Sequence, residues 1–173
     1  MLIVVRGLPG TGKTFFSENF ASAIDAMLVS SDRLRSERGL RGRYEESVKE
    51  LVYKEMFDRA RSALSEKKTC LLDATFSKQD RLKVVASMAE EHEVGFYVIE
   101  MTADVSIIKE RVSRSRKFSE ANVEVYEKIK REYEPIQGDY LLLNSSEITL
   151  DAMIAKAKKY IGYDGNSTQQ VAQ

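Results

Sequence analysis

Apolar and polar positions along the chain follow two alternating periodicities. Short runs that are apolar throughout, the pattern of strands buried on both faces, occur at residues 2–5, 26–29, 70–72, 94–99 and 140–143. Between these runs apolar residues recur at helical spacing, as at Val48, Val52 and Met56 in a long segment that starts near Tyr44. The alternation predicts a three-layer α/β fold, with a five-stranded parallel sheet covered by helices on both faces.

The pattern is typical of one domain, which we place at residues 1–162. Gly162 is a good terminator for the last helical segment, and the polar residues 163–173 are predicted to be a disordered tail. No apolar run reaches the roughly 18 residues of a membrane span. The single cysteine, Cys70, lies in an apolar run and cannot form an internal disulfide. We therefore expect a cytoplasmic protein in which Cys70 fills the core.

The first apolar run leads directly into a glycine-rich loop. Residues 7–14 read Gly-Leu-Pro-Gly-Thr-Gly-Lys-Thr and match the phosphate-binding pattern G-x-x-x-x-G-K-[ST]. Glycines let the backbone aim successive N–H groups at phosphate oxygens, and the helix that follows adds its positive end. We expect Lys13 to reach the β- and γ-phosphates of ATP and Thr14 to place its hydroxyl on Mg²⁺. The nucleotide-binding residues predicted here are Gly7, Pro9, Gly10, Thr11, Gly12, Lys13 and Thr14.

Proteins with such a loop include GTPase switches, hydrolytic ATPases and kinases, and other motifs separate these classes. The segment that follows Asp73, Ala-Thr-Phe, lacks the glycine of the GTPase motif D-x-x-G. Residues 77–80 imitate a base-reading motif, but they come too early in the chain. Ala74 also stands where an ATPase usually has the glutamate that orients water. The remaining class, a kinase that transfers phosphate to a hydroxyl, is the predicted one.

A kinase of this kind needs a carboxylate near the acceptor, and Asp32 is available. It follows the second apolar run, at the carboxyl edge where open α/β sheets hold ligands. Asp32 can accept the proton of the acceptor hydroxyl; the alternative is a helix N-cap. Arg35 lies one helical turn further on and can clamp an acceptor phosphate or steady the transferring group.

Two further segments carry candidate chemistry. Asp73 ends the third apolar run beside the phosphate loop, and we expect it to support Mg²⁺, directly or through water; its alternative role is to cap the following turn. Residues 110–117 are rich in arginine and connect two helical segments. They are predicted to form a helical lid at about 113–120, with Arg114 or Arg116 acting on the triphosphate. The alternative is a solvated basic turn.

A cationic stretch directly follows the candidate base. Between residues 33 and 43 only Glu37 is acidic, although the whole chain has 27 basic and 27 acidic residues. The zero net charge argues against non-specific coating of nucleic acid. A local cationic patch still suits an acceptor that carries phosphate, such as the 5′ end of RNA or DNA. The candidate acceptor-binding residues are Arg35, Arg38 and Arg41, and the alternative is a solvated surface turn.

Together these motifs resemble one branch of the P-loop kinases. The loop at residues 7–14, the S-D-x-x-R segment at 31–35, residues 71–75 and the arginine-rich segment occur in the order of the polynucleotide-kinase-like family. That branch includes 5′-hydroxyl polynucleotide kinases, seryl-tRNA kinases and zeta toxins, and the similarity runs from residue 1 to about 146.

The resemblance implies ATP and Mg²⁺ at Lys13 and Thr14, with Asp32 as general base. It makes Arg35 the acceptor clamp and Arg114 or Arg116 the lid arginine. Phe76 stands where the family commonly has asparagine, and Arg81 falls where it often carries an arginine. Three functions are therefore expected, in order: a kinase of a polynucleotide or nucleotide 5′-hydroxyl, a small-molecule kinase, and a non-catalytic nucleotide-binding switch.

Overall fold

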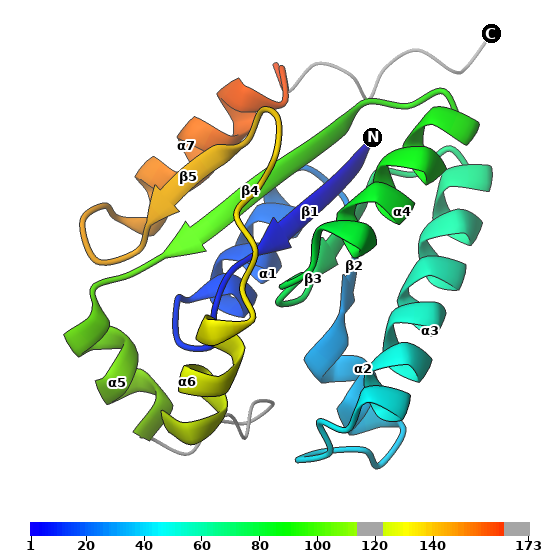
Figure 1. Cartoon of the computed structure of the whole chain (residues 1–173). Helices are drawn as coiled ribbons and strands as arrows, with labels where there is room; N and C mark the ends of the chain where they lie inside the picture. The colour runs from blue at the N-terminus through cyan, green and yellow to red at the C-terminus, as the bar shows by residue number, and fades with distance from the viewer. Residues whose placement is uncertain (114–122, 165–173) are drawn as a thin grey trace, which may run out of the picture.

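The computed structural model describes residues 1–113 and 123–164, and its five strands form one parallel sheet (Figure 1). The spatial order is β2-β3-β1-β4-β5. The strands are β1 (Leu2–Arg6), β2 (Met27–Ser30), β3 (Cys70–Asp73), β4 (Phe96–Thr102) and β5 (Leu141–Asn144). All neighbouring pairs run parallel, which confirms the predicted architecture. Each strand extends past its predicted end to a polar residue that the apolar pattern does not include.

Helices connect the strands and cover the sheet. They are α1 (Lys13–Ala23), α2 (Ser31–Glu37), α3 (Glu46–Ser65), α4 (Gln79–Glu91), α5 (Val105–Ser113), α6 (Val123–Arg131) and α7 (Leu150–Tyr160). In the part of the chain that the structure describes, no helix is both long and apolar enough to cross a membrane. The proposed lid arginines Arg114 and Arg116 lie outside the described residues, as does most of the predicted tail.

Two hydrophobic cores lie on opposite faces of the sheet because successive strand residues point to opposite sides. Leu2 and Val4 of β1 pack in one core, with residues of α3 and α4. Ile3 and Val5 of the same strand pack in the other, with residues of α1 and α7. The sheet is therefore the middle of three layers (Figure 1). Cys70 is free and buried in the first core, as predicted.

A buried arginine fixes the segment that follows α6. Arg6, the last residue of β1, donates from Nε to the Tyr133 hydroxyl at 2.8 Å and from Nη2 to the Glu134 carbonyl at 2.8 Å. The Glu134 carboxylate in turn accepts a hydrogen bond from the backbone N–H of Gln79, at the start of α4. These bonds join the carboxyl end of β1, the segment after α6 and the start of α4, which together border the site described next.

Candidate active site

The loop between β1 and α1 has a backbone that only glycine accommodates at two positions. Gly7 has φ +152°, and a Cβ there would lie 2.4 Å from the Met101 carbonyl oxygen. Gly10 has φ +91°, and its Cβ would lie 3.0 Å from side-chain atoms of Ile108 and Val112 on α5. The sequence pattern therefore has a steric cause: the loop is pressed against β4 and α5.

Hydrogen bonds within the loop fix its conformation. The Thr11 hydroxyl donates to the Leu8 carbonyl oxygen at 2.8 Å, and Lys13 Nζ donates to the same oxygen at 3.0 Å. Lys13 and Thr14 are the first two residues of α1, so they lie at the positive end of the helix. This geometry suits an anion, because backbone N–H groups and the lysine converge on one place.

Asp73 lies beside the loop at the end of β3. Its buried carboxylate accepts hydrogen bonds from Ser30 Oγ at 3.1 Å and from the Thr14 hydroxyl. Burial raises the pKa of Asp73 to about 6, although nearby Lys13 opposes that rise. The two side chains predicted to support Mg²⁺, Thr14 and Asp73, are therefore in contact in the structure.

These two side chains fit a magnesium ion chemically, since hydroxyl and carboxylate oxygens are the hard donors that Mg²⁺ prefers. Within residues 1–113 and 123–164, no group of three or more His, Cys, Asp or Glu side chains could hold a metal by itself. Phosphate oxygens would have to complete the coordination, as is usual for Mg²⁺ bound with a nucleotide.

Asp32 and Arg35 lie across from the loop on α2. Ser30 is the N-cap of this helix, and Asp32 belongs to its first turn, so the alternative role of Asp32 as the N-cap is wrong. The Asp32 carboxylate lies 3.6 Å from the Arg35 guanidinium, whose side chain is only 9% exposed. Ser30 is the cap position because β2 runs one residue further than the apolar pattern predicts, directly into α2.

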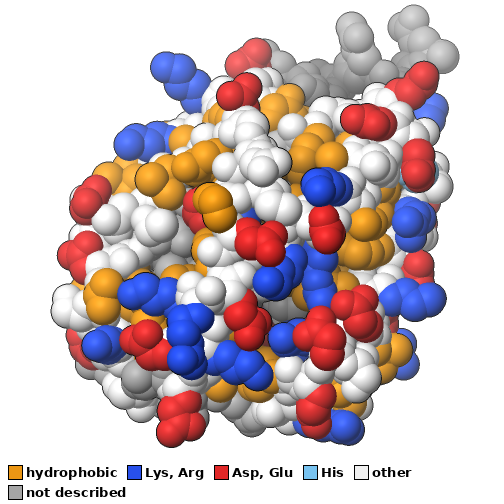
Figure 2. Space-filling view, in the orientation of Figure 1, with side chains coloured by type: hydrophobic (Ala, Val, Ile, Leu, Met, Phe, Trp, Pro, Cys, Tyr) orange, Lys and Arg blue, Asp and Glu red, His pale blue; other side chains and the backbone are white. Residues whose placement is uncertain are grey.

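One cavity of about 580 Å³ joins the phosphate loop to α2. Of the predicted residues, Pro9, Gly10, Gly12, Lys13, Thr14, Asp32, Arg35 and Asp73 line it. Charged side chains of both signs gather on the lower part of the face drawn in Figure 2. The cavity is also lined by residues to which the sequence analysis gave no role: Tyr44, Glu46, Lys49, Tyr53, Lys78, Arg81, Arg111 and Ser145.

Arg111 joins three segments at the phosphate-loop side of the cavity. Its Nη1 donates to Ser145 Oγ at 2.8 Å and to the Gly10 carbonyl oxygen at 3.2 Å. The arginine therefore ties α5 and the segment after β5 to the phosphate loop. Ile108 and Val112 are the buried residues of this helix, and Arg111 is adjacent to Val112 and one turn from Ile108. The apolar spacing in the sequence therefore places Arg111 next to the packed face of the helix.

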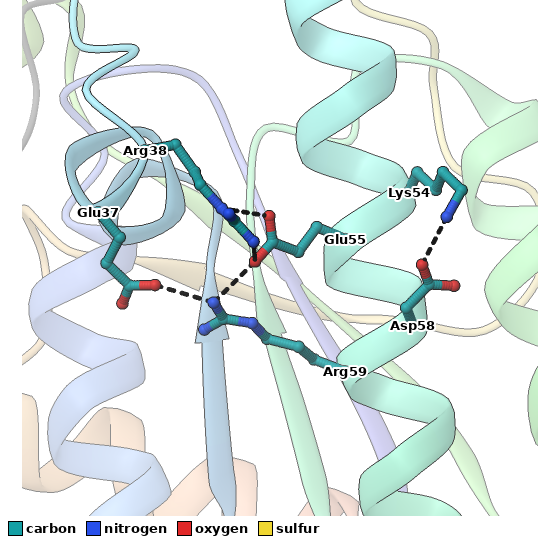
Figure 3. A network of polar contacts seen from close by, with 6 residues as sticks. All are labelled: Glu37, Arg38, Lys54, Glu55, Asp58 and Arg59. Carbon is teal, nitrogen blue, oxygen red and sulfur yellow. Dashed lines mark hydrogen bonds and ion pairs between the residues drawn. The ribbon is translucent and has the colours of Figure 1, made fainter.

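Arg38 and Arg41 are not among the residues that line the cavity. Arg38 donates from Nε and Nη2 to both carboxylate oxygens of Glu55, at 3.0 and 2.9 Å (Figure 3). Arg59 also pairs with Glu55 and reaches Glu37, so the four side chains form an exposed network. The predicted acceptor role of Arg38 and Arg41 stays a prediction.

Comparisons with solved structures find the same fold in two kinases and in a third protein that was solved with a nucleotide. A gluconokinase from Sinorhizobium meliloti has a TM-score of 0.70 at 16% identity, covering 92% of this chain and 90% of that one. An APS kinase from Mycobacterium tuberculosis, solved with AMPPNP and APS, has a TM-score of 0.70 at 11% identity, covering 93% and 96%. Chaetomium thermophilum Kti12, solved with ADP-AlF3, has a TM-score of 0.64 at 19% identity, covering 93% and 99%.

The sequence itself matches a protein family over most of its length. The profile of the family described as "AAA domain" matches residues 2–136 of the 173. The matched region includes the phosphate loop, α2, Asp73 and Arg111, and it ends before β5. This chain therefore belongs to the AAA domain family.

Proposed function

We propose that the chain is an ATP-dependent phosphotransferase that moves the γ-phosphate to an acceptor hydroxyl. The observation that carries this proposal is the shared cavity, in which Lys13 and Thr14 lie on one side and Asp32 and Arg35 on the other. A nucleotide switch has no need of a second charged subsite across from its phosphates. A kinase needs one, because two substrates must meet in line.

The nucleotide half binds and orients ATP. The phosphate loop and Lys13 hold the β- and γ-phosphates, and Thr14 with Asp73 hold Mg²⁺, which neutralises charge on the phosphates when bound. Apolar side chains on the same side of the cavity give the base a surface to pack on; they are Phe15, Ile148, Leu150 and Met153. The resemblance to polynucleotide-kinase-like proteins assigns the corresponding loop the same role.

The acceptor half supplies the proton transfer. Asp32 takes the proton of the acceptor hydroxyl as its oxygen bonds to the γ-phosphorus, and the bond from that phosphorus to the β–γ bridging oxygen breaks to release ADP. Arg35, which pairs with Asp32, stabilises the negative charge of the transferring phosphate or of a phosphate on the acceptor. Arg114 or Arg116 is proposed to act on the transferring phosphate from the lid side.

The solved structures of this fold support nucleotide binding. The APS kinase was solved with AMPPNP, an ATP analogue, together with APS. Kti12 was solved with ADP-AlF3. Because these identities are below 20%, they support nucleotide binding at the loop and leave the acceptor open.

For the acceptor we propose the 5′-hydroxyl of a polynucleotide or nucleotide. The support is the cationic stretch at 33–43 and the S-D-x-x-R segment at 31–35. A small-molecule kinase is the second candidate, and a specific observation favours it: Arg38 is engaged by Glu55 outside the cavity. The likeness to a gluconokinase points the same way.

The test is phosphoryl transfer from ATP with Mg²⁺ to three acceptors: a 5′-hydroxyl oligonucleotide, the matching nucleoside and a neutral sugar. Much higher kcat/KM for the oligonucleotide, with a KM that rises with salt, supports the polynucleotide assignment. Activity on the sugar alone overturns that assignment and keeps the kinase. ATP binding without transfer to any hydroxyl leaves the nucleotide switch as the function.

A further inference from the structure

Arg81 lies in the acceptor half of the cavity and is held there by an aromatic ring. It belongs to the first turn of α4, and its guanidinium carbon lies 3.7 Å from the centre of the Tyr53 ring on α3. Tyr53 is itself fixed, because its hydroxyl accepts a hydrogen bond from the Phe76 backbone N–H at 3.0 Å. Both Arg81 and Tyr53 line the cavity with Arg35.

Two of the arginines that line the cavity, Arg81 and Arg35, keep unused hydrogen-bonding capacity. Arg81 Nη1 and Arg35 Nε are buried and have no hydrogen-bond partner. The side chains are only 15% and 9% exposed, so bulk water does not replace the missing partners. Buried guanidinium groups with unmet donors are costly unless a ligand supplies acceptors.

The acidic partners of Arg81 have exposed side chains, and Glu46 is also paired with Lys49 at 3.1 Å. Arg81 Nη2 pairs with Glu46 at 3.2 Å and with Glu50 at 2.8 Å, and each of these glutamate side chains is 68% exposed. Glu46 also lines the cavity, so its carboxylate occupies part of the space beside Arg81. An exposed side chain can swing into solvent at little cost, since such ion pairs contribute at most about 1 kcal/mol.

We propose that Arg81 and Arg35 form an anion subsite for the acceptor, and that the Glu46 carboxylate occupies this subsite until a phosphate group carried by the acceptor displaces it. Guanidinium groups bind phosphate oxygens through paired N–H donors, and stacking on Tyr53 keeps the plane of Arg81 fixed. The Tyr53 hydroxyl proton remains available to the same phosphate, because the hydroxyl oxygen uses a lone pair toward Phe76. Arg35 bridges the subsite and Asp32, so the bound phosphate positions the acceptor hydroxyl.

This inference rests on the proposed kinase function and assigns the acceptor its phosphate group. It places the acceptor cations on α2 and α4 rather than at Arg38. A phosphate ester of a small molecule and the 3′-phosphate of a nucleotide present the same group. Glycerol 3-phosphate and thymidine 3′-monophosphate therefore serve as separate probes, each compared with its phosphate-free parent.

The decisive variant is Arg81→Gln, and Arg59→Gln is its matched control. Like Arg81, Arg59 pairs with two glutamates, but it does not line the cavity. Its substitution by glutamine removes the same charge as Arg81→Gln. For wild type we expect kcat/KM at least about tenfold higher for a phosphate-bearing probe than for its parent, the size of one or two charge-assisted hydrogen bonds. Arg81→Gln removes most of that preference through KM, and Arg59→Gln keeps it. Glu46→Gln lowers KM for the same probe.

One outcome would overturn the proposed subsite, and two others call for a second variant or a binding measurement. A lower melting temperature for Arg81→Gln with the preference intact means that Arg81 only joins α3 to α4, and the inference fails. If Arg81→Gln does not fold, Arg81→Lys keeps the charge without the planar fork and must still lose most of the preference. If wild type transfers phosphate to no hydroxyl, the proposed function fails. Calorimetry with Mg²⁺ and AMPPNP then decides the subsite: Arg81-dependent binding of a phosphate-bearing probe supports it, and no binding overturns it.

Discussion

The two halves of the cavity are built in different ways. The nucleotide half uses eight consecutive residues, 7–14, and its anion-binding groups are mostly backbone N–H groups at the start of α1. The acceptor half uses side chains from α2, α3 and α4, with Asp32, Tyr53 and Arg81 as examples. Backbone donors fix a ligand group common to all nucleoside triphosphates. Side chains from separate helices can differ from protein to protein without disturbing the sheet, so we propose that the acceptor half determines substrate choice.

The largest expected effect comes from the nucleotide half. Lys13→Ala removes the cation directed at the γ-phosphate, and we expect the single-turnover transfer rate to fall on the order of 10³-fold, as when a charge on the transferring phosphoryl group is lost. The fold should persist, because the Lys13 side chain is bonded to the Leu8 carbonyl oxygen of its own loop and not to the hydrophobic cores. Transfer at the wild-type rate would show that the phosphates bind elsewhere.

Asp32→Asn tests the acceptor half with a smaller effect. The substitution keeps size and removes basicity, so we expect kcat to fall about 10²-fold while the Kd for ATP hardly changes. Asp32 raises the pKa of nearby Asp73 but also pairs with the buried Arg35, so its neutralisation relieves one interaction and weakens another, and kcat and ATP affinity are the readouts that decide its role. Loss of ATP binding would instead assign Asp32 to the metal, and an unchanged kcat would remove it from catalysis.

Asp73→Asn concerns stability and is measured in metal-free protein with a chelator present. Burial raises the Asp73 pKa from 3.8 to about 6, so its contribution to stability is complete below pH about 4 and is lost as pH rises to about 6. Above that pH the buried carboxylate costs up to about 3 kcal/mol. We expect Asp73→Asn to unfold at higher urea than wild type at pH 8, with the gap closing toward pH 4. A gap that widens toward pH 4 would contradict this account.

The exposed arginine network should give the smallest effect. Arg38→Ala with Arg41→Ala breaks the pair between Arg38 and Glu55, and surface pairs contribute about 1 kcal/mol or less to the free energy of unfolding. If residues 33–43 hold a nucleic acid, the double variant raises KM for an oligonucleotide with little change in kcat. If the double variant has the wild-type KM for the oligonucleotide at low salt, Arg38 and Arg41 do not bind the acceptor, and the cavity residues alone recognise it.

The sequence predicted the phosphate loop, because its residues are contiguous and their spacing is dictated by phosphate geometry, but it gave no role to Arg111 or Ser145 beside that loop. All five strands were also predictable, since buried parallel strands are apolar throughout. Asp73 was a candidate because it directly follows an apolar run, and Asp32 because it comes three residues after another. The acceptor half was not predictable to the same extent. Tyr53 and Arg81 meet only through packing of α3 on α4, and 28 residues of sequence separate them.

The partner of Arg38 could not be predicted from the sequence. A run of basic residues gives the charge of a segment but not the partner of each side chain. Glu55 lies on α3, and only the packing of α2 against α3 brings its carboxylate to Arg38 (Figure 3). The carboxylate of Glu55 therefore neutralises part of the positive charge of residues 33–43, which the sequence alone predicts to be an available cationic patch.

The most direct test follows the γ-phosphate itself. ATP labelled at the γ-phosphate is incubated with Mg²⁺, the full chain, and a mixture of oligonucleotide, nucleoside, phosphate-bearing and neutral sugar acceptors. Our account predicts that the label moves to an acceptor hydroxyl with wild type, and that both Lys13→Ala and Asp32→Asn strongly reduce this transfer. Label that appears only as inorganic phosphate, or that stays in ATP with every acceptor, would contradict the assignment of the cavity to phosphoryl transfer.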